Sequence, residues 1–313
     1  ESVEPKACYW DADFYRAHIV EQLLPFWAHH AADSQYGGFI THLDRQGRVY
    51  DDMLKTAAMQ ARMIFGFAIG YELCADPTYL RLAEEGVRFL IERLWDPHAG
   101  GWYQEVWRDG RVKVTDKSIF AQAYVLIGLA EYCRITHDPI AWEHACWTYD
   151  LLEQAAWDEV NGGYYETCGV DWQPISNAKT ICIQLDMLMA ALCLYGVTPE
   201  EHYFRRARQL ADLIATRMRD PRYGCVLERF SSSWVYDPVS TRDRLQMGHN
   251  LKTAWLLLRL FERTHVEDYF STAIEVLESC LRCGWDETYG GFYQHVYRNG
   301  VLAKDVKEWW PEC

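Results

Sequence analysis

The sequence predicts an all-α protein, an (α/α)6 barrel assembled from one repeated unit. Glycine-marked segments begin at residues 37, 100, 162, 224 and 290, so the unit recurs every 62 to 66 residues. Each period has room for one β-hairpin and two helices of about 16 to 20 residues. Because a helical hairpin that repeats around a ring closes into a toroid, we expect inner helices after each hairpin and outer helices before it. The hairpins are then expected over one mouth of the ring.

The first repeat shows the pattern of each element. Apolar residues recur at helical spacing from about Asp11 to Ala31, and the segment Tyr36–Gly47 then alternates as a strand does and ends in a polar-glycine turn. Two further helical patterns follow, from about Lys55 to Leu73 and from Pro77 to Leu94. The expected order is therefore helix, hairpin, inner helix and outer helix.

Later copies of the unit keep the same internal spacing. Nine residues lead from the second glycine of the pair to the glycine of the hairpin turn in three copies, Gly38 to Gly47, Gly101 to Gly110 and Gly291 to Gly300. Asn161–Tyr165 and Tyr223–Cys225 are weaker copies. Such glycines are explained by positive φ or close packing before any functional role is needed. The inner helices are expected to begin near Lys55, Lys117, Lys179, Arg242 and Lys307.

The chain is expected to form a single domain, residues 1–313, that stops before the ring is complete. Six such periods need roughly 380 to 400 residues, and this chain supplies about five periods. An open ring would expose the apolar flanks of its end helices, which proteins rarely tolerate over such an area. We therefore interpret the sequence as a C-terminally truncated form of a longer protein.

Composition and charge exclude several classes of function. The formal net charge of −14 repels nucleic-acid phosphates and membrane surfaces. No apolar run approaches the roughly 20 residues of a membrane span, and the first residues do not form a signal peptide. The 11 cysteines lie mostly in helical patterns and indicate reduced thiols in the cytoplasm. Cys280-x-x-Cys283 lacks the second pair that a zinc site requires, so we expect no metal.

Four residues with polar groups recur at the repeat spacing. Arg62, Tyr124, Asp186 and His249 are separated by 62, 62 and 63 residues, and each is expected about two turns into an inner helix. Inner helices present their N-terminal turns to the mouth that the hairpins cover, so these side chains are predicted to converge on one pocket. The 14 Trp and 20 Tyr suit such a cleft, where flat rings meet hydroxyl-rich ligands.

The chemistry of these side chains fits proton abstraction beside a carbonyl group. His249 is a base that titrates near neutrality, Arg62 is a fixed cation for a developing enediolate oxygen, and Asp186 is an acceptor for hydroxyls. Each also has a structural interpretation. His249 could be an ordinary helix histidine, Arg62 and Asp186 could be ordinary salt-bridge partners, and Tyr124 could line the pocket wall. Gly248, which allows close approach of the chain, favours the functional interpretation of His249.

Six short blocks, spread over nearly the whole chain, carry a family resemblance. They are Gly37-Gly38-Phe39, Gln60-Ala61-Arg62, Asp116–Tyr124, Gly248-His249, Trp255-Leu256-Leu257 and Lys307-Glu308-Trp309-Trp310-Pro311. On these blocks the chain resembles the N-acylglucosamine 2-epimerase family, which includes cellobiose 2-epimerases and mannose isomerases. The last two blocks are fairly specific, whereas other α/α barrels also contain glycine pairs.

The resemblance implies cofactor-free deprotonation and reprotonation at C2 of a ring-opened aldose through a cis-enediolate. A pair of histidines would move the protons. His249 matches the first of them, Arg62 matches the arginine that stabilises the intermediate, and Trp309 or Trp310 matches an aromatic platform near the sugar. The second histidine of the family lies on the sixth inner helix, beyond Cys313. The chain as given is therefore expected to be unable to complete the two-base cycle.

Two departures from the family pattern bear on the substrate. Lys252 stands where many members have a glutamate three residues after the histidine, and Asp186 stands where cellobiose epimerases tend to have a histidine. Both changes weaken the case for a disaccharide, so we expect a monosaccharide such as mannose, glucose, fructose or N-acylglucosamine. The side chains predicted to contact it are those of Asp186, Tyr124, Lys117, Lys252, Trp309 and Trp310.

Two other functions stay open for this fold. A hydrolase or lyase of oligosaccharides would need two carboxylic acids at glycosidase spacing, and Asp186 has no partner in the same repeat phase. The other is non-catalytic binding of carbohydrate or protein, since the family includes a renin-binding protein. As partners we expect a small-molecule sugar but neither nucleic acid nor membrane, and a homodimer is left open.

Overall fold

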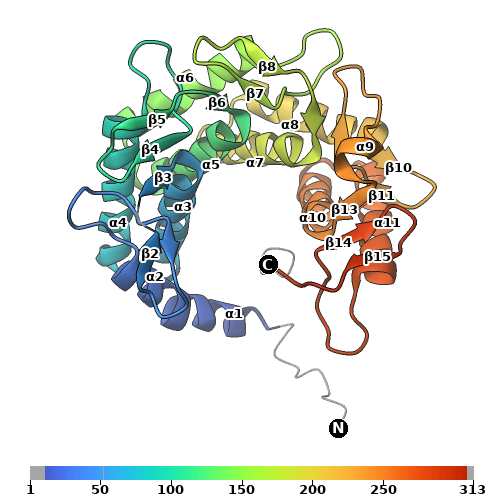
Figure 1. The fold of residues 1–313 in the computed structure, drawn as a ribbon, viewed down its shortest axis with the longest axis horizontal. Coiled ribbons are helices and arrows are strands. Elements are labelled where there is room, and N and C mark those ends of the chain that lie inside the picture. Colours follow the sequence, from blue (N-terminus) through green and yellow to red (C-terminus); the bar gives the residue numbers. More distant parts are fainter. Residues whose placement is uncertain (1–10, 52, 309–313) are drawn as a thin grey trace. The chain divides into compact units, whose positions relative to one another are not determined.

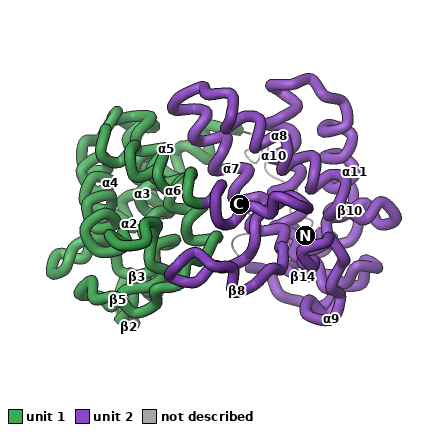
Figure 2. Tube along the Cα trace, turned by 90° about the horizontal axis from the view of Figure 1, so that it is seen from above, with its two compact units in different colours: residues 1–151 green, residues 152–313 purple. Residues whose placement is uncertain are grey.

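The computed structural model describes residues 11–51 and 53–308, most of which are helical (Figure 1). Contacts divide the chain into two compact units, residues 1–151 and 152–313 (Figure 2). The predicted helical class is confirmed, whereas the single domain and the incomplete ring stay predictions. Within the described ranges, no helix combines the length and the apolar character needed to cross a membrane.

Unit 1 consists of helices joined by short β-hairpins. Its elements are α1 (Ala12–His18), a π-helical turn (Ile19–Leu23), α2 (Leu24–His30), β1 (His42–Leu43), β2 (Val49–Asp51), β3 (Leu54–Thr56), α3 (Ala57–Cys74), α4 (Pro77–Phe89), a π-helical turn (Leu90–Leu94), β4 (Glu105–Trp107), β5 (Val112–Val114), β6 (Lys117–Ser118), α5 (Ile119–Thr136) and α6 (Pro139–Ala155). α6 ends just past the unit boundary. α3 packs against α4 and α5, and β4 pairs with both β3 and β5 in an antiparallel sheet.

Unit 2 repeats this construction. Its elements are β7 (Thr167–Cys168), β8 (Pro174–Ser176), β9 (Lys179–Thr180), α7 (Ile181–Val197), α8 (Glu201–Leu213), a π-helical turn (Ile214–Met218), β10 (Arg219–Asp220), β11 (Cys225–Val226), β12 (Arg229–Phe230), α9 (Pro238–Thr241), β13 (Arg244–Gln246), α10 (Met247–Thr264), α11 (Glu267–Gly284), β14 (His295–Tyr297) and β15 (Leu302–Lys304). α7 packs against α8 and α10, and α10 packs against α11. β14 pairs with both β13 and β15 in an antiparallel sheet.

The same short link joins α3 to α4 and α5 to α6. α3 is closed by Ala75, whose φ of 56° is left-handed, and Asp76 then caps α4 by accepting the backbone N–H of Thr78 at 2.8 Å. His137 and Asp138 repeat this arrangement between α5 and α6. A proline follows each capping aspartate at the first position of the helix. These local signals explain why the helices of the first repeat lie within two residues of their predicted bounds.

An amide side chain on each inner helix holds the glycine turn that precedes it in sequence. The N–H of Phe39 donates to Oε1 of Gln60, and the C=O of Phe39 accepts from Nε2, both at 2.8 Å. The equivalent pairs are Gln122 with Trp102, Gln184 with Tyr164 and Asn250 with Val226. Each amide residue is the fourth of its helix, so these pairs define the register of the repeat.

Lysines hold the aspartate at the start of three glycine turns. The pairs, with their Nζ–Oδ2 distances, are Lys55–Asp33 (2.8 Å), Lys117–Asp96 (2.7 Å) and Lys179–Asp158 (2.7 Å). None of these six side chains is more than 4% exposed. Burial acts to raise the pKa of Asp158, but hydrogen bonds from Lys179 and the backbone outweigh it and hold that pKa at about 2. The lysines that precede the inner helices are therefore structural ion-pair partners.

Candidate active site

His249 lies in the first turn of α10, and a carboxylate holds its imidazole. Nδ1 of His249 is 2.7 Å from Oε2 of Glu228, and the two side chains are only 13% and 10% exposed. Oε1 of Glu228 accepts the backbone N–H of Gln246 at 2.7 Å, and its backbone C=O accepts the N–H of Ile181 at 3.0 Å. Glu228 is thus fixed by the first residues of α7 and the strand before α10, and it fixes the orientation of the imidazole in turn.

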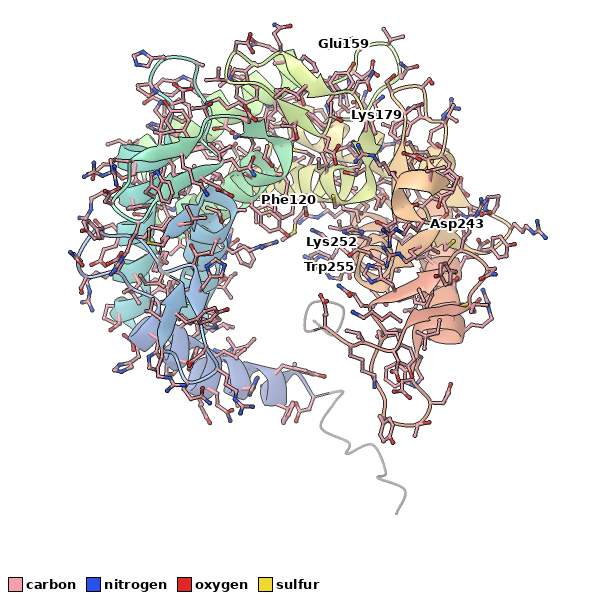
Figure 3. All side chains as sticks on the ribbon, viewed as in Figure 1. Phe120, Glu159, Lys179, Asp243, Lys252 and Trp255 are labelled. Atoms are coloured by element: carbon pink, nitrogen blue, oxygen red, sulfur yellow. The ribbon has the colours of Figure 1, made fainter. Side chains whose placement is uncertain are left out.

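A second pair lies one turn further along α10. Nζ of Lys252 forms an ion pair with Oδ1 of Asp186, which projects from α7. The side chain of Asp186 is 3% exposed and that of Lys252 is 20% exposed, so solvent reaches the ammonium side of the pair. Trp255 follows at the same spacing, is 48% exposed and lies beside Lys252 in Figure 3. One side of α10 therefore presents an imidazole, an ammonium group and an indole in succession.

The structure corrects the repeat phase expected for His249. Arg62, Tyr124 and Asp186 are each the sixth residue of their helix, but the sixth residue of α10 is Lys252, and His249 is the third. The four helices begin at residues 57, 119, 181 and 247, so the last interval is 66 residues instead of 62. α9 and its flanking loop lie in this longer interval. Lys252, not His249, is therefore the repeat equivalent of Arg62.

Arg62 and Tyr124 meet in unit 1. The guanidinium carbon of Arg62 lies 4.1 Å from the centre of the Tyr124 ring and 5.3 Å from that of Phe120. Arg62 is exposed, and its alternative interpretation as an ordinary salt-bridge partner stays a prediction. The same interpretation fits Asp186, which is buried and paired. An exposed guanidinium beside two aromatic rings presents N–H donors that can bind an oxygen atom.

Lys117 is placed where a sugar does not reach it. Its side chain is 0% exposed, and its Nζ is 2.7 Å from the carboxylate of Asp96 and 4.7 Å from the centre of the Tyr103 ring. This placement corrects the expectation that Lys117 contacts the substrate, because its charge is neutralised inside the protein. Trp309 and Trp310, the other predicted sugar contacts, lie outside the described residues.

Two residues near His249 were not predicted from the sequence. One is Glu228, and the other is His295, which faces Gln246 in the pairing of β13 with β14. Burial lowers the pKa of His295, and the positive charge of Arg244 lowers it further. His295 therefore adds a neutral imidazole to the surroundings of the α10 N-terminus. Over the described ranges, no group of three or more His, Cys, Asp or Glu residues is arranged to hold a metal ion.

Comparison with known proteins decides which family this arrangement belongs to. A family model described as N-acylglucosamine 2-epimerase matches residues 38–313. The chain belongs to the N-acylglucosamine 2-epimerase family. Its relatives include the cellobiose 2-epimerase of Bacteroides fragilis, 25% identical, with 94% of this chain and 77% of that protein covered. The D-mannose isomerase of Marinomonas mediterranea is also 25% identical (96% and 77% covered), and the N-acylglucosamine 2-epimerase of Bos taurus is 28% identical (94% and 71% covered).

Solved structures share the fold of this N-acylglucosamine 2-epimerase family member. A crystal structure of a D-mannose isomerase matches with a TM-score of 0.87 at 23% identity, covering 96% of this chain and 78% of that one. An α-1,6-mannanase of Salegentibacter matches less closely, with a TM-score of 0.66 at 18% identity over 88% and 73% of the two chains. At these identities the structural matches establish the fold. The family relatives establish the protein as an enzyme of the isomerase class.

Proposed function

We propose that the protein is a sugar epimerase or isomerase that acts at C2 of a ring-opened aldose through a cis-enediolate. The observation that supports this most is the pairing of His249 with Glu228. When Nδ1–H of His249 donates to the carboxylate, Nε2 is the unprotonated ring nitrogen and becomes the base. The family relatives support sugar as the substrate class, and the likeness of this chain to a solved D-mannose isomerase supports the predicted (α/α)6 barrel.

In this proposal His249 removes the proton from C2. The electron pair of the C–H bond forms the C1–C2 double bond, and the carbonyl oxygen becomes the negatively charged enediolate oxygen. Return of a proton to the opposite face of C2 re-forms the C1 carbonyl and gives the epimer, whereas transfer of the O2–H proton to O1 together with protonation at C1 gives the ketose, whose carbonyl is at C2. The imidazolium formed on His249 is stabilised by Glu228, whose second oxygen is occupied by a backbone N–H.

Cationic donors are needed where the enediolate charge develops. Lys252 is one turn from His249 on α10, and its ammonium is held by Asp186 with part of its surface open to solvent. We assign it to the substrate oxygen that accepts the negative charge. Arg62, which the family resemblance places on the intermediate, has the same role in this proposal. Its exposure and its stacking on Tyr124 support a preorganised guanidinium.

The substrate in this proposal is a monosaccharide such as mannose, glucose, fructose or N-acylglucosamine. The 48% exposed indole of Trp255, one turn from Lys252, offers a flat apolar face on which one sugar ring or chain can rest. Tyr124 offers a ring and a hydroxyl. Trp309 and Trp310 keep the platform role that the resemblance implies. The two departures from the family pattern, Asp186 and Lys252, are joined in one ion pair, which supports a changed specificity.

Hydrolysis of an oligosaccharide is the competing enzymatic function, and its support is the likeness of fold to mannanases. A glycosidase requires one carboxylic acid that donates a proton and one carboxylate that acts as base or nucleophile. In unit 2, Glu228 is bonded to His249 and Asp186 to Lys252, so neither is a free acid. This engagement favours the isomerase over the hydrolase.

The test is incubation of the protein with mannose, glucose or N-acetylglucosamine in D2O, followed by NMR of the sugar. Exchange of the C2 proton for deuterium without any added cofactor is expected, because it needs only the base His249, and replacement of His249 by Asn should abolish it while the circular dichroism stays the same. A mannobiose control detects hydrolysis. Release of mannose from mannobiose without exchange of the C2 proton of mannose would favour the hydrolase, and loss of neither activity on His249→Asn would remove His249 from the mechanism. A protein that binds sugar but exchanges no C2 proton would support the non-catalytic alternative.

A further inference from the structure

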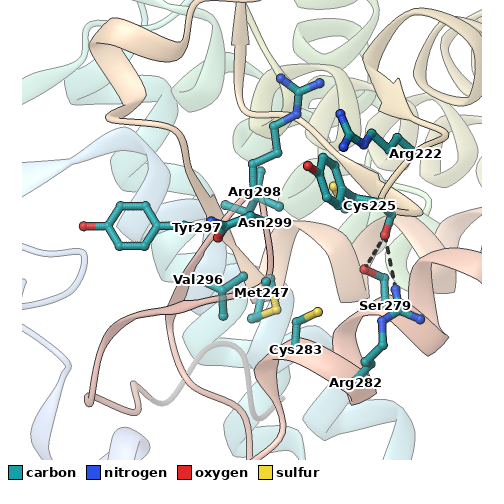
Figure 4. A pocket seen from close by; sticks show the side chains of 13 residues that line it. Arg222, Cys225, Met247, Ser279, Arg282, Cys283, Val296, Tyr297, Arg298 and Asn299 are labelled. Carbon is teal, nitrogen blue, oxygen red and sulfur yellow. Dashed lines mark hydrogen bonds between the residues drawn. The ribbon is translucent and has the colours of Figure 1, made fainter.

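A cavity of about 360 Å³ lies in unit 2, beneath the turn that joins β14 to β15 (Figure 4). Four segments surround it: the turn between β10 and β11, the end of β13 with the start of α10, the last turns of α11, and the β14–β15 hairpin. Arg222, Arg282 and Arg298 contribute one guanidinium each, and Leu245 and Met247 contribute apolar walls. None of the residues assigned above to sugar chemistry lines this cavity.

The cavity exists because two long side chains of the first repeat have short or apolar counterparts here. Lys55 pairs in strand register with Val106 in unit 1, and Leu245 takes the matching register with Val296 in unit 2. In unit 1 the long side chain of Arg93 packs under Gly110, the glycine of the hairpin turn. A Cβ placed on Gly110 would lie 2.7 Å from Cδ of Arg93.

The corresponding place in unit 2 is occupied by a cysteine. A Cβ on Gly300 would lie 2.8 Å from Sγ of Cys283, so Cys283 stands where Arg93 stands in the first repeat. A thiol is several atoms shorter than a guanidinium side chain. Loss of both the buried lysine and this arginine leaves space under the hairpin, and the equivalent hollow in unit 1 is about 230 Å³.

The charges around the cavity do not balance. Arg298 forms an ion pair with Asp220, and Asp243, whose carboxylate accepts the hydroxyl of Tyr236, also raises the pKa of Arg298. Arg282 donates to the backbone C=O of Tyr223 at 3.3 Å. Within the described part of the chain, Arg222 and Arg282 have no carboxylate in ion-pair contact, so two positive charges are left uncompensated in a protein of net charge −14.

Two of the cavity's arginines lie around the aromatic ring of Tyr223. The guanidinium carbons of Arg222 and Arg298 lie 5.2 and 5.8 Å from the centre of its ring, so the two cations gather around one aromatic side chain. The opposite wall is apolar. Its members are Cys225, Leu245, Met247 and Val296, each at most 2% exposed. A cavity of this size and composition suits a small molecule with one charged end and one apolar end.

We propose that this cavity binds a small organic phosphate, a dianion whose oxygens bond to the arginines and whose apolar group lies against the apolar wall. A phosphate monoester carries close to two negative charges at neutral pH, which matches the excess of two guanidiniums. The site is separate from the proposed sugar site. Met247, in its wall, is nevertheless only two residues before His249, so an occupant would contact the strand and helix that hold the base.

Binding is tested with phenyl phosphate as the probe, by isothermal titration calorimetry on the intact protein. We expect binding that phenol does not reproduce and that weakens about tenfold in each of Arg222→Met and Arg282→Met, because each loses one charge-assisted hydrogen bond. Arg217→Met removes an equally exposed arginine outside the cavity and should leave the affinity unchanged. Cys283→Met, which fills the cavity without changing its charge, should also weaken binding. Equal affinity in all variants, or no binding at millimolar probe, would overturn the proposal.

The cavity thiol gives an independent readout. Cys283 lines the cavity and is partly exposed, whereas Cys74 is an exposed thiol in unit 1. The anion iodoacetate should modify Cys283 about tenfold faster, relative to neutral iodoacetamide, than it does Cys74, because a cationic cleft concentrates anions. Phenyl phosphate should protect Cys283 and leave Cys74 unaffected, as followed by peptide mass spectrometry. The same iodoacetate-to-iodoacetamide ratio at both thiols, or equal protection, would contradict an anion site.

Discussion

Replacement of Glu228 by Gln tests the proposed base most sharply, because it keeps the shape of the side chain and changes what it offers to His249. The amide can still accept the N–H of Gln246 through Oε1, but its Nε2 then donates to Nδ1 of His249. With Nδ1 of His249 as the acceptor, the imidazole carries its proton on its own Nε2, which is the wrong tautomer for a base. One charge-assisted hydrogen bond between nearly buried groups is worth about 1.5 to 3 kcal/mol.

At about 1.36 kcal/mol for each factor of ten, this loss lowers kcat/KM for exchange of the C2 proton by about 10- to 150-fold, and the wrong tautomer lowers it further. The assay is the initial rate of C2 proton exchange of mannose in D2O followed by NMR, with circular dichroism to verify folding. Glu275→Gln is the matched control, because Glu275 pairs with Arg219 at the surface of the same unit. A folded Glu228→Gln variant with the kcat/KM of the wild type would refute the assignment of His249 and Glu228 as a working pair.

Three further predictions concern the ion pairs. Lys252→Met should lower kcat by about a hundredfold through loss of the donor to the enediolate, and it should also lower Tm because Asp186 stays buried without its cation. Adding Asp186→Asn should recover Tm but not kcat, and recovery of both would assign Lys252 a structural role only. Lys117→Met should destabilise the fold by about 3 to 5 kcal/mol, measured by urea denaturation, and should leave KM unchanged, since the pair with Asp96 is fully buried; a raised KM in the folded variant would restore Lys117 to the sugar site. Acid titration followed by circular dichroism should show stability falling as the pH drops from about 4 towards 2. The pKa of Asp158 is about 2 in the folded protein against an ordinary value of 3.8. The stabilisation that this carboxylate gives the fold is therefore complete at pH values above 3.8 and is lost as the pH falls through about 2. For this carboxylate, Asp158→Asn should flatten that part of the curve, and an unchanged curve would contradict the pairing.

Local signals are the reason that the helices could be predicted from the sequence. Asp76 and Asp138 cap helices that begin with proline, and glycine pairs mark the turns before the hairpins. The spacing between repeats was less reliable. A constant step of 62 residues leads from Asp186 to a position near His249, but the longer connection before α10 moves the true equivalent to Lys252. Insertions in loops change such counts without changing the helices that they connect.

The partner of His249 could not be read from its own neighbourhood, because Glu228 is 21 residues away and belongs to another connection. A signal existed in the repeat register. Glu228 comes two residues after the residue clamped by the inner-helix amide, and the equivalent positions of the other repeats are also polar, Thr41, Gln104 and Glu166. The burial of Lys117 had the opposite cause. Its regular recurrence suggested function, but the structure uses it for a buried ion pair with Asp96, as it uses Lys55 and Lys179 for ion pairs with Asp33 and Asp158.

Hydrogen exchange at C2 of the sugar measures most directly whether His249 takes a proton from that carbon. Mannose is incubated with the protein in D2O, and loss of the C2 proton signal is followed by NMR. We expect enzyme-dependent deuterium incorporation at C2 that falls at least a hundredfold in His249→Asn and is unchanged in His265→Asn, a control at the other end of α10 where the left-handed φ of 54° suits asparagine. Exchange that persists in His249→Asn, or deuterium that never enters C2 while sugar is converted, would contradict this role of His249.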